Sequence, residues 1–285
     1  MMETERDYLD ETFACAYLRC PLCGAPMEKV GGSYLCTGAR RHTYDLARAG
    51  YVNLNTHLPT SGDTAEMAAA RQAFLRKDYY APLADALADA AKTFAPAHGV
   101  LADAGCGEGY YTERSGASFD FTLGADLSKY ALALAGKSAK RAGLAERILY
   151  TAASVYALPL ADGVCDCVQS VFAPIAEDEF SRILKRGGVL VTAAAGRDHL
   201  TELKALLYDT VIPNEERKDY PAALTQIETR RLCYTAEIAK DDIYPLFTMT
   251  PYFYRTNKER AARLHTLDRL SLTLDFEIRI FIKDC

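Results

Sequence analysis

Several features that would place a protein in or across a membrane are missing from this 285-residue sequence. No run of about eighteen apolar residues occurs without a charge, which excludes an ordinary membrane-spanning helix. The first eleven residues are acidic and lack the basic-then-apolar order of a secretion signal. We therefore expect a cytoplasmic protein with no membrane partner, large enough to bury a substantial core.

An excess of basic charge, the usual mark of a nucleic-acid-binding chain, is also absent, because the formal net charge is −5. The charge is unevenly distributed, however. Residues 14–60 hold five basic side chains against two acidic ones, so contact with a polyanion is expected in this part of the chain. On charge alone, an ordinary solvated surface explains the same residues.

The nine cysteines do not form the pattern of a secreted disulfide framework, because the chain is long and their number is odd. Reduced thiols or metal ligands are the better interpretation. Cys20, Cys23 and Cys36 cluster near the N-terminus. The others in apolar or strand-like sequence are expected to be small buried hydrophobic residues: Cys106, Cys165, Cys167, Cys233 and Cys285.

The N-terminal cluster has the spacing of a metal knuckle. Two residues separate Cys20 from Cys23, and Gly24 follows them. Cys36 follows a short strand at Ser33–Leu35, and five residues separate it from His42. Three sulfurs and one imidazole are a donor set for a closed, structural Zn²⁺ site. The alternative is a pair of unrelated buried cysteines with His42 facing solvent from its basic surroundings.

Two helices are expected after this cluster. Residues 57–62 suggest a loop, and Asp63 with Glu66 resembles a capping box. The first helix carries an apolar stripe of Met67, Ala70, Phe74 and Leu75, with Arg71 expected elsewhere on its surface. The second has Pro82 in its first turn and buries Leu83, Leu87, Ala90 and Phe94.

From Gly99 onward strands and helices alternate, which predicts a parallel sheet with crossover helices. The expected strands are residues 100–103, 121–126, 148–152, 166–172 and 189–193. Helices are expected at 130–141 and at 177–184, the latter closed by a turn at 185–188. Ligands of such sheets bind at the carboxyl ends of the strands, where Asp103, Asp126, Ser154 and residues 172–174 fall.

A glycine-rich loop follows the first of these strands. Glycine at 105, 107 and 109 permits a sharp turn and leaves main-chain N–H groups open to a ligand. A dinucleotide-binding loop prefers Gly-x-Gly-x-x-Gly after an apolar strand end, whereas here Asp103 ends the strand and the glycines alternate. The remaining alternative is a tight turn with helix-capping acids and no ligand.

The pattern Asp-x-Gly-x-Gly-x-Gly resembles the first motif of class I S-adenosylmethionine-dependent methyltransferases. In that family an acid at the end of the second strand accepts both ribose hydroxyls, and Asp126 occupies this position. Ser154 matches the position that borders the adenine. Glu108 could pair with the cofactor amine or cap the next helix.

A closer resemblance spans essentially all of the chain beyond about residue 18. The Cys/His cluster, the runs Tyr44–Leu54, Gly62–Met67 and Arg71–Leu75, and the loop Gly105–Thr112 are similar to the 23S ribosomal RNA (guanine-N1)-methyltransferase family. Further matching segments are Ala173-Pro174, Gly196–Leu200, Glu202–Lys204 and Met249–Pro251.

This resemblance implies a class I methyltransferase of the α/β class, Rossmann-like, with a small N-terminal zinc-binding module. The expected divisions are 14–56 for the zinc-binding, RNA-recognising module, 57–96 for a helical linker and 97–285 for the methyltransferase domain. The implied partners are 23S ribosomal RNA, methylated at guanine N1 in a hairpin loop, and a second copy of the chain that shares a cleft.

The resemblance also implies site residues. Zn²⁺ would be held by Cys20, Cys23, Cys36 and His42. S-adenosylmethionine would be contacted by Tyr80, Asp103, Gly105, Cys106, Gly107, Glu108, Gly109, Asp126, Ser154 and His199. From the residues alone, His199 could equally cap the helix that follows it, and Tyr80 could simply pack.

No catalytic base is assigned. Residues 171–174 (Val-Phe-Ala-Pro) lack the acidic or Asn-Pro-Pro-aromatic motif of many base methyltransferases, and Phe172 and Pro174 are expected either at the target base or in the core. Two other functions stay open. One is methylation of a small molecule, and the other is RNA binding without catalysis.

Overall fold

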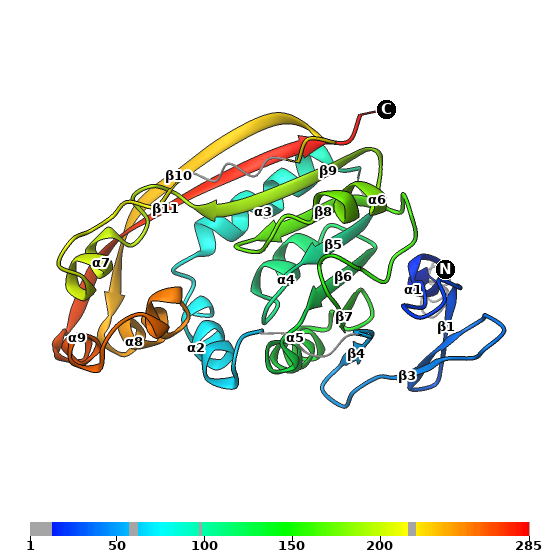
Figure 1. Cartoon of the computed structure of the whole chain (residues 1–285), viewed down its shortest axis with the longest axis horizontal. Coiled ribbons are helices and arrows are strands. Elements are labelled where there is room, and N and C mark those ends of the chain that lie inside the picture. The colour runs from blue at the N-terminus through cyan, green and yellow to red at the C-terminus, as the bar shows by residue number, and fades with distance from the viewer. Residues whose placement is uncertain (1–12, 57–61, 97–98, 216–220, 285) are drawn as a thin grey trace, which may run out of the picture.

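The computed structural model describes residues 13–56, 62–96, 99–215 and 221–284. Figure 1 shows a small N-terminal part at one end, a central sheet flanked by helices, and an elongated C-terminal part at the other end. The acidic N-terminal extension, most of the loop expected at 57–62, and Cys285 lie outside the described residues.

The N-terminal part is built from short antiparallel strands. After α1 (Phe13–Tyr17), strands β1 (Met27–Val30), β2 (Ser33–Cys36) and β3 (Thr43–Asp45) pair in the order β1-β2-β3. Strand β2 confirms the strand expected at Ser33–Leu35. Strands this short bury little apolar surface, so their stability has to come from elsewhere.

The central sheet has eight strands in the order β10-β11-β9-β8-β5-β6-β7-β4. Its parallel middle consists of the five expected strands, which are β5 (Val100–Ala104), β6 (Phe121–Asp126), β7 (Ile148–Ala152), β8 (Cys165–Val171) and β9 (Leu184–Ala195). Crossover helices α4 (Tyr110–Gly116), α5 (Lys129–Ala142) and α6 (Glu177–Ile183) connect them. The fold class predicted from the alternating pattern is thus confirmed.

Three further strands enlarge this sheet. β4 (Tyr51–Asn53) pairs in parallel with β7, while β11 (Arg269–Ile282) pairs antiparallel with both β9 and β10 (Thr225–Ala239). β4 belongs to the segment expected to form the zinc-binding module, yet it is the edge strand of the central sheet. The divisions at residues 56 and 96 remain predictions.

The turn expected at residues 185–188 is wrong. α6 ends at Ile183 and β9 begins at once with Leu184, so these residues lie within the strand. A register shift between Cys165 and Cys167 of β8 accommodates the irregular start of β9, where Gly187 has φ 74°. Lys185 Nζ lies 2.8 Å from Asp166 Oδ2, which ties the two strands together.

Two helices precede the sheet. α2 (Ala65–Leu75) is capped by Thr64 and not by Asp63, because Thr64 Oγ1 accepts the N–H of Met67 at 3.2 Å. α3 (Ala81–Phe94) has Pro82 in its first turn as expected and buries Leu83, Leu87 and Ala90, whereas Phe94 is only half-buried. Both helices pack into the core of the methyltransferase-like part.

The C-terminal helices are α7 (Thr201–Leu207), α8 (Lys240–Thr248) and α9 (Lys258–Arg263), with single turns η1 (Pro251–Tyr254) and η2 (Leu264–Thr266). They gather at the end of β10 and β11 that lies away from the N-terminal part, and α2 lies between α8 and α5 (Figure 1). None of the helices in the described ranges has the length and apolar character that crossing a membrane requires.

Two large apolar clusters form the core. One joins α3, β9, β11 and α8. The other joins Leu18 and Met27 of the N-terminal part with Phe121 and Leu160 of the sheet domain. Cys106, Cys165 and Cys167 are buried as predicted, but Cys233 is exposed because it lies on the half-exposed edge strand β10.

Candidate cofactor and metal sites

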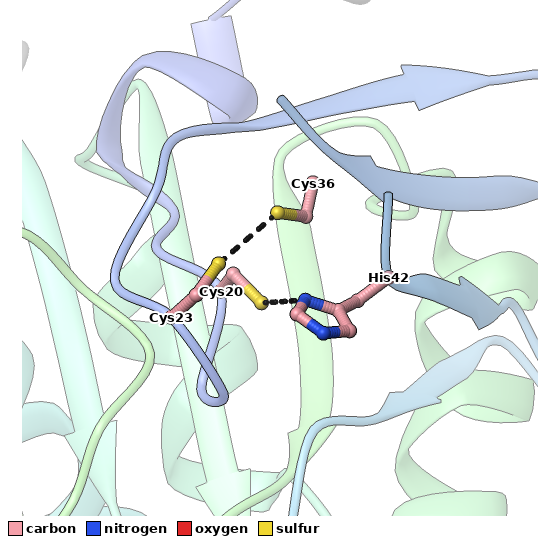
Figure 2. Close-up of side chains that lie close together, drawn as sticks. All are labelled: Cys20, Cys23, Cys36 and His42. Atoms are coloured by element: carbon pink, nitrogen blue, oxygen red, sulfur yellow. Dashed lines mark hydrogen bonds between the residues drawn. The ribbon is translucent and has the colours of Figure 1, made fainter. Parts of the chain in front are cut away.

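The four expected metal ligands lie together in the N-terminal part. Their ligand atoms are all within 4.8 Å of one another. Cys23 Sγ is 3.3 Å from Cys36 Sγ, and Cys20 Sγ is 3.4 Å from His42 Nδ1 (Figure 2). His42 therefore points into the cluster and not into solvent.

Local backbone geometry explains this convergence. Cys20 and Cys23 sit on a turn closed by the Gly24 N–H donating to Cys20 O at 2.8 Å. Cys36 ends β2 and its N–H donates to His42 O at 2.9 Å, which brings the histidine beside it just before β3. Two loops thus present two ligands each, the arrangement of a closed tetrahedral Zn²⁺ site.

The chemistry of the donor set fits Zn²⁺. Burial acts to raise the pKa of the Cys36 thiol, but hydrogen bonds from Cys23 and the Gly38 N–H outweigh it and lower the pKa to about 6. A thiolate is the form that ligates a metal. Four protein ligands leave no open coordination position, so the bound ion would be structural.

The glycine loop lies at the carboxyl end of β5. The N–H groups of Gly105 and Cys106 both donate to Ala125 O, at 2.8 and 3.0 Å, which fastens the loop to β6. Gly105, Gly107 and Gly109 all have positive φ, a region that side chains rarely adopt. A Cβ at Gly107 would meet no atom of the described residues within 4 Å, so this part of the structure leaves the loop open to a ligand at Gly107.

Asp126, at the end of β6, is bound to that loop. Its Oδ2 accepts the Gly107 N–H at 3.0 Å and its Oδ1 accepts the Ser128 N–H at 2.7 Å. Burial raises the pKa of this carboxyl although both N–H groups act to lower it. The structure places Asp126 at the carboxyl end of β6, as expected, and these two hydrogen bonds hold the carboxylate in a fixed orientation.

Two further carboxyl groups are buried near the loop. Asp103 Oδ2 accepts the Thr112 hydroxyl at 2.6 Å, and burial raises the pKa of Asp103 to about 6. Glu108 Oε1 accepts the Tyr110 N–H at 3.2 Å, so this side chain caps α4. Burial raises the pKa of Glu108 to about 7. Glu108 Oε2 accepts no hydrogen bond from the described residues and lies 3.7 Å from an Arg76 nitrogen.

Tyr80 and His199, 119 residues apart, are brought together. The Tyr80 hydroxyl and His199 Nε2 are 3.2 Å apart, and His199 Nδ1 accepts the Asp275 N–H at 3.3 Å. Desolvation lowers the pKa of His199 to about 4, so its imidazole is neutral. His199 does not cap α7, whose N-cap is Leu200.

The loop after β8 connects this pair to the glycine loop. Ala173 Cβ lies 2.5 Å from where a Cβ on Gly105 would be. The adjacent Phe172 has φ 53° and is 42% exposed, with its ring centroid 6.0 Å from Phe276 and 6.5 Å from His199. An aromatic residue in this backbone region is strained, which is a common property of functional loops.

Ser154 lies beside Asp126 but faces another space. Its Oγ accepts the Tyr156 N–H at 3.2 Å, and the Ala153 N–H donates to Asp126 O at 3.2 Å. Ser154 also lines a cleft of about 710 Å³ between the N-terminal part and the loop after β7, together with Arg19, Leu54 and the exposed Tyr156.

Arg71 is a residue that the sequence analysis misplaced. It lies on the same face of α2 as the buried Met67 and Phe74, because it follows Met67 by four residues and precedes Phe74 by three, and its side chain is 29% exposed. The prediction placed it elsewhere on the helix than the apolar stripe. The i, i+4 spacing to Met67 was the signal that could have found it.

Two family profiles match the sequence. The profile described as "RlmA, N-terminal", a zinc ribbon, matches residues 18–60, and the one described as "Methyltransferase domain" matches residues 102–192. These ranges contain the Cys/His cluster and the glycine loop with Asp126, respectively.

Curated relatives match along most of the chain. YxjB of Bacillus subtilis (strain 168), which carries a provisional name as a 23S rRNA (guanine-N(1)-)-methyltransferase, is 30% identical over 96% of this chain and 100% of its own length. The 23S rRNA (guanine(748)-N(1))-methyltransferase of Streptomyces fradiae is 39% identical over 66% of each chain.

Among solved structures, the YcgJ protein of Bacillus subtilis aligns with a TM-score of 0.50 at 16% identity, over 70% of this chain and 99% of its own. At this identity the likeness concerns the fold alone.

Proposed function

The chain belongs to the 23S rRNA (guanine-N1)-methyltransferase family, and we infer that it transfers a methyl group from S-adenosylmethionine to N1 of a guanine in 23S ribosomal RNA. The observation that carries this conclusion is the combination, in one chain, of a glycine loop hydrogen-bonded to Asp126 and a Cys₃His cluster. We further propose that the guanine lies in a hairpin loop of the RNA.

The cofactor would be held by residues of four segments. Asp126 offers carboxylate oxygens for the ribose hydroxyls, and the open backbone at Gly107 leaves room for the methionyl part. Asp103, Cys106 and Glu108 are buried at the loop, while Ser154, which follows β7, would reach the adenine from the neighbouring cleft. Tyr80 and the neutral His199, which are hydrogen-bonded to each other, would line another side of the cofactor site.

S-adenosylmethionine, when bound, supplies an electrophilic methyl group, so the protein has mainly to align the guanine and exclude water. Guanine N1 carries a proton at neutral pH, and this proton must leave. The exposed ring of Phe172 and the backbone carbonyls of Ala173 and Pro174, which lie within 3.5 Å of Ser170 Oγ, line the side of the loop where the base would enter. No side chain is assigned as the base.

The zinc module would bind the RNA. Its surplus of basic residues and the cleft that contains Arg19 and Tyr156 support this role, because cationic and aromatic side chains bind phosphates and bases. Residues 14–56 would form this module, with residues 57–96 linking it to a methyltransferase domain at 97–285. Ribosomal RNA as substrate would place the protein in the cytoplasm.

We also propose a homodimer with a shared cleft. β10 is a 15-residue strand at the edge of the central sheet, and it leaves Ile227 42% exposed. Such an edge is suited to pairing with another chain. Light scattering during gel filtration measures the mass, and a monomer at micromolar concentration would contradict this part of the proposal.

The activity is tested with 23S ribosomal RNA from cells that lack the gene. Purified protein and labelled S-adenosylmethionine should transfer methyl groups to this RNA, and primer extension should stop at one guanine because N1 methylation blocks base pairing. Asp126→Asn should abolish transfer, and Glu146→Gln at an exposed position should not. Cofactor binding without transfer to this RNA would indicate a small-molecule substrate, and the absence of cofactor binding would indicate a non-catalytic RNA-binding protein.

A further inference from the structure

Arg71 occupies an unusual place for a charged side chain. It lies on the face of α2 that carries the buried Met67 and Phe74, and its own side chain is 29% exposed. α2 contacts α5 of the sheet domain and α8 of the C-terminal part (Figure 1). Placing a guanidinium in such a position carries a desolvation cost, so it calls for a partner.

Two acceptors hold one nitrogen of the guanidinium. One Nη lies 3.0 Å from Asp63 Oδ2 and 3.3 Å from Met249 O at the end of α8. The Nε atom is buried and has no hydrogen-bond partner among the described residues. Arg71 is therefore held in one orientation with a donor to spare, and guanidinium donors act as a planar fork.

The anchoring segment is the one that rests on the turn after Asp126. Asp63 O accepts the Ser128 hydroxyl at 2.7 Å, and the Ser128 N–H in turn donates to the Asp126 carboxylate at 2.7 Å. A Cβ on Gly62 would lie 2.8 Å from Ser128 N, so the segment is in close contact with this turn. Arg71 is thus linked, through Asp63 and Ser128, to the carboxylate that accepts the Gly107 N–H.

The charge of Arg71 reaches the acids of the site. Burial raises the pKa of Asp126 and of Glu108, and Arg71 acts to lower both. Arg76, the next cation along the chain, is already occupied, because its Nη atoms donate to both oxygens of Glu113 at 2.9 and 3.1 Å and to Ser138 at 2.9 Å. Arg71 is the arginine of α2 that keeps a donor available.

We propose that Arg71 binds the carboxylate of the methionyl part of S-adenosylmethionine. The methionyl part carries a carboxylate as well as an ammonium, and Asp103, Glu108 and Asp126 around the loop would repel the carboxylate. An arginine fork is the side chain best suited to bind it through paired hydrogen bonds. This inference rests on the proposed function and adds a cofactor-binding residue to it.

Calorimetry with two ligands tests this assignment. S-adenosylmethionine and its decarboxylated form differ in the carboxylate and share the ammonium, sulfonium and adenosine groups. We expect Arg71→Gln to weaken S-adenosylmethionine binding at least tenfold and to change binding of the decarboxylated ligand by less than threefold. Arg71→Met, which keeps the aliphatic stem between Met67 and Phe74, should give the same selective loss and replaces the first variant if that one does not fold.

Lys77→Gln, at an exposed position beyond α2, is the matched control and should leave both affinities unchanged. Equal losses for the two ligands would overturn the proposal, because they would mean that Arg71 only positions α2 against Met249. Unchanged binding of S-adenosylmethionine would overturn it as well. If the native protein bound neither ligand, the proposed function itself would fall, a result distinct from native binding that Arg71 does not influence.

Discussion

The N-terminal module and the central sheet obtain their stability in different ways. Strands β5 to β8 are buried along nearly their whole length, so apolar burial supports them. Strands β1 to β3 have three or four residues each, of which at most two per strand are buried, and the side chains of Cys20, Cys23, Cys36 and His42 converge beside them. A metal can thus replace a core that the module is too small to form.

The two regions are nevertheless not independent. Leu18 forms a β-bridge with Leu160, both are fully buried, and the same apolar cluster contains Met27, Tyr34 and Phe121. The module and the sheet are therefore stabilised in different ways and still share an apolar interface. The following variants distinguish the effect of the metal from the effect of this interface.

The largest effect is expected from Cys36→Ser. Structural zinc contributes about 10–16 kcal/mol to small domains, so loss of one thiolate should remove the ion and unfold β1 to β3. Metal analysis should fall from one zinc per chain to none, and hydrogen exchange should rise across residues 18–45. Affinity for S-adenosylmethionine should stay within threefold. Cys233→Ser, at an exposed cysteine, is the control, and a loss of exchange protection in β5 and β6 as well would contradict this separation.

Leu160→Ala tests the shared interface. Removing a fully buried leucine side chain costs about 2–5 kcal/mol. Urea denaturation should show this loss as a lower midpoint, with reduced exchange protection in both the N-terminal module and the sheet. Leu22→Ala, at a leucine that is 58% exposed, should have little effect. Reduced protection in one region alone would mean that the regions are stabilised separately.

Two glycines of the loop separate stability from binding. A Cβ at Gly109, which has φ 88°, would collide with the buried Tyr150 hydroxyl, so Gly109→Ala should cost about 1–3 kcal/mol or more. Gly107→Ala meets open space and should cost about 1 kcal/mol, for its positive φ. Thermal denaturation ranks the two. Relative to the unfolding free energy that each variant loses, Gly107→Ala should reduce the affinity for S-adenosylmethionine more than Gly109→Ala does. The opposite ranking would mean that the cofactor does not bind at Gly107.

A pH dependence caused by Glu108 is expected to be similar in size to the effects of the two glycine substitutions. Burial raises its folded pKa to about 7, above the ordinary value of 4.5, so ionisation disfavours the folded state. Stability without cofactor should decline as the pH rises from about 4.5 through 7. Glu108→Gln should remove the part of this decline that Glu108 causes, while Asp103, with a folded pKa of about 6, still contributes its own part. The variant should be more stable by on the order of 2 kcal/mol at pH 8. Denaturation at pH 5 and pH 8 measures the free energy of unfolding, and Glu146→Gln, at an exposed position, is the control. If this free energy changed equally with pH in Glu108→Gln and in the native protein, Glu108 would not be the cause of the decline.

The sequence predicted those parts of the fold that repeat a strong local pattern. Alternating apolar strands and helices gave β5 to β9, and fixed spacing identified Cys20, Cys23, Cys36 and His42 before any geometry was known. The glycine loop and Asp126 were found for the same reason, since each follows the end of a buried strand.

Features that depend on contacts between residues far apart in the chain were not predicted from the sequence. β4 has three residues and becomes a strand through its pairing with β7, while Lys185–Gly188 resemble a turn and join β9 because a register shift in β8 accommodates them. Asp63 and Thr64 are both good N-caps, and the choice depends on the ion pair that Asp63 makes with Arg71. The spacing of Arg71 from Met67 indicates its face of α2, but its contacts with Asp63 and with Met249 O depend on the tertiary structure.

β4 also sets an order of events during synthesis. Tyr51 pairs with Tyr150, so the edge strand leaves the ribosome 99 residues before its partner. The Cys/His cluster, complete at residue 42, can close around its ion during that interval, while β4 waits unpaired. Joining the two regions is then a late, long-range step of folding, and a metal-loaded module would be tethered to an unfinished sheet until β7 is made.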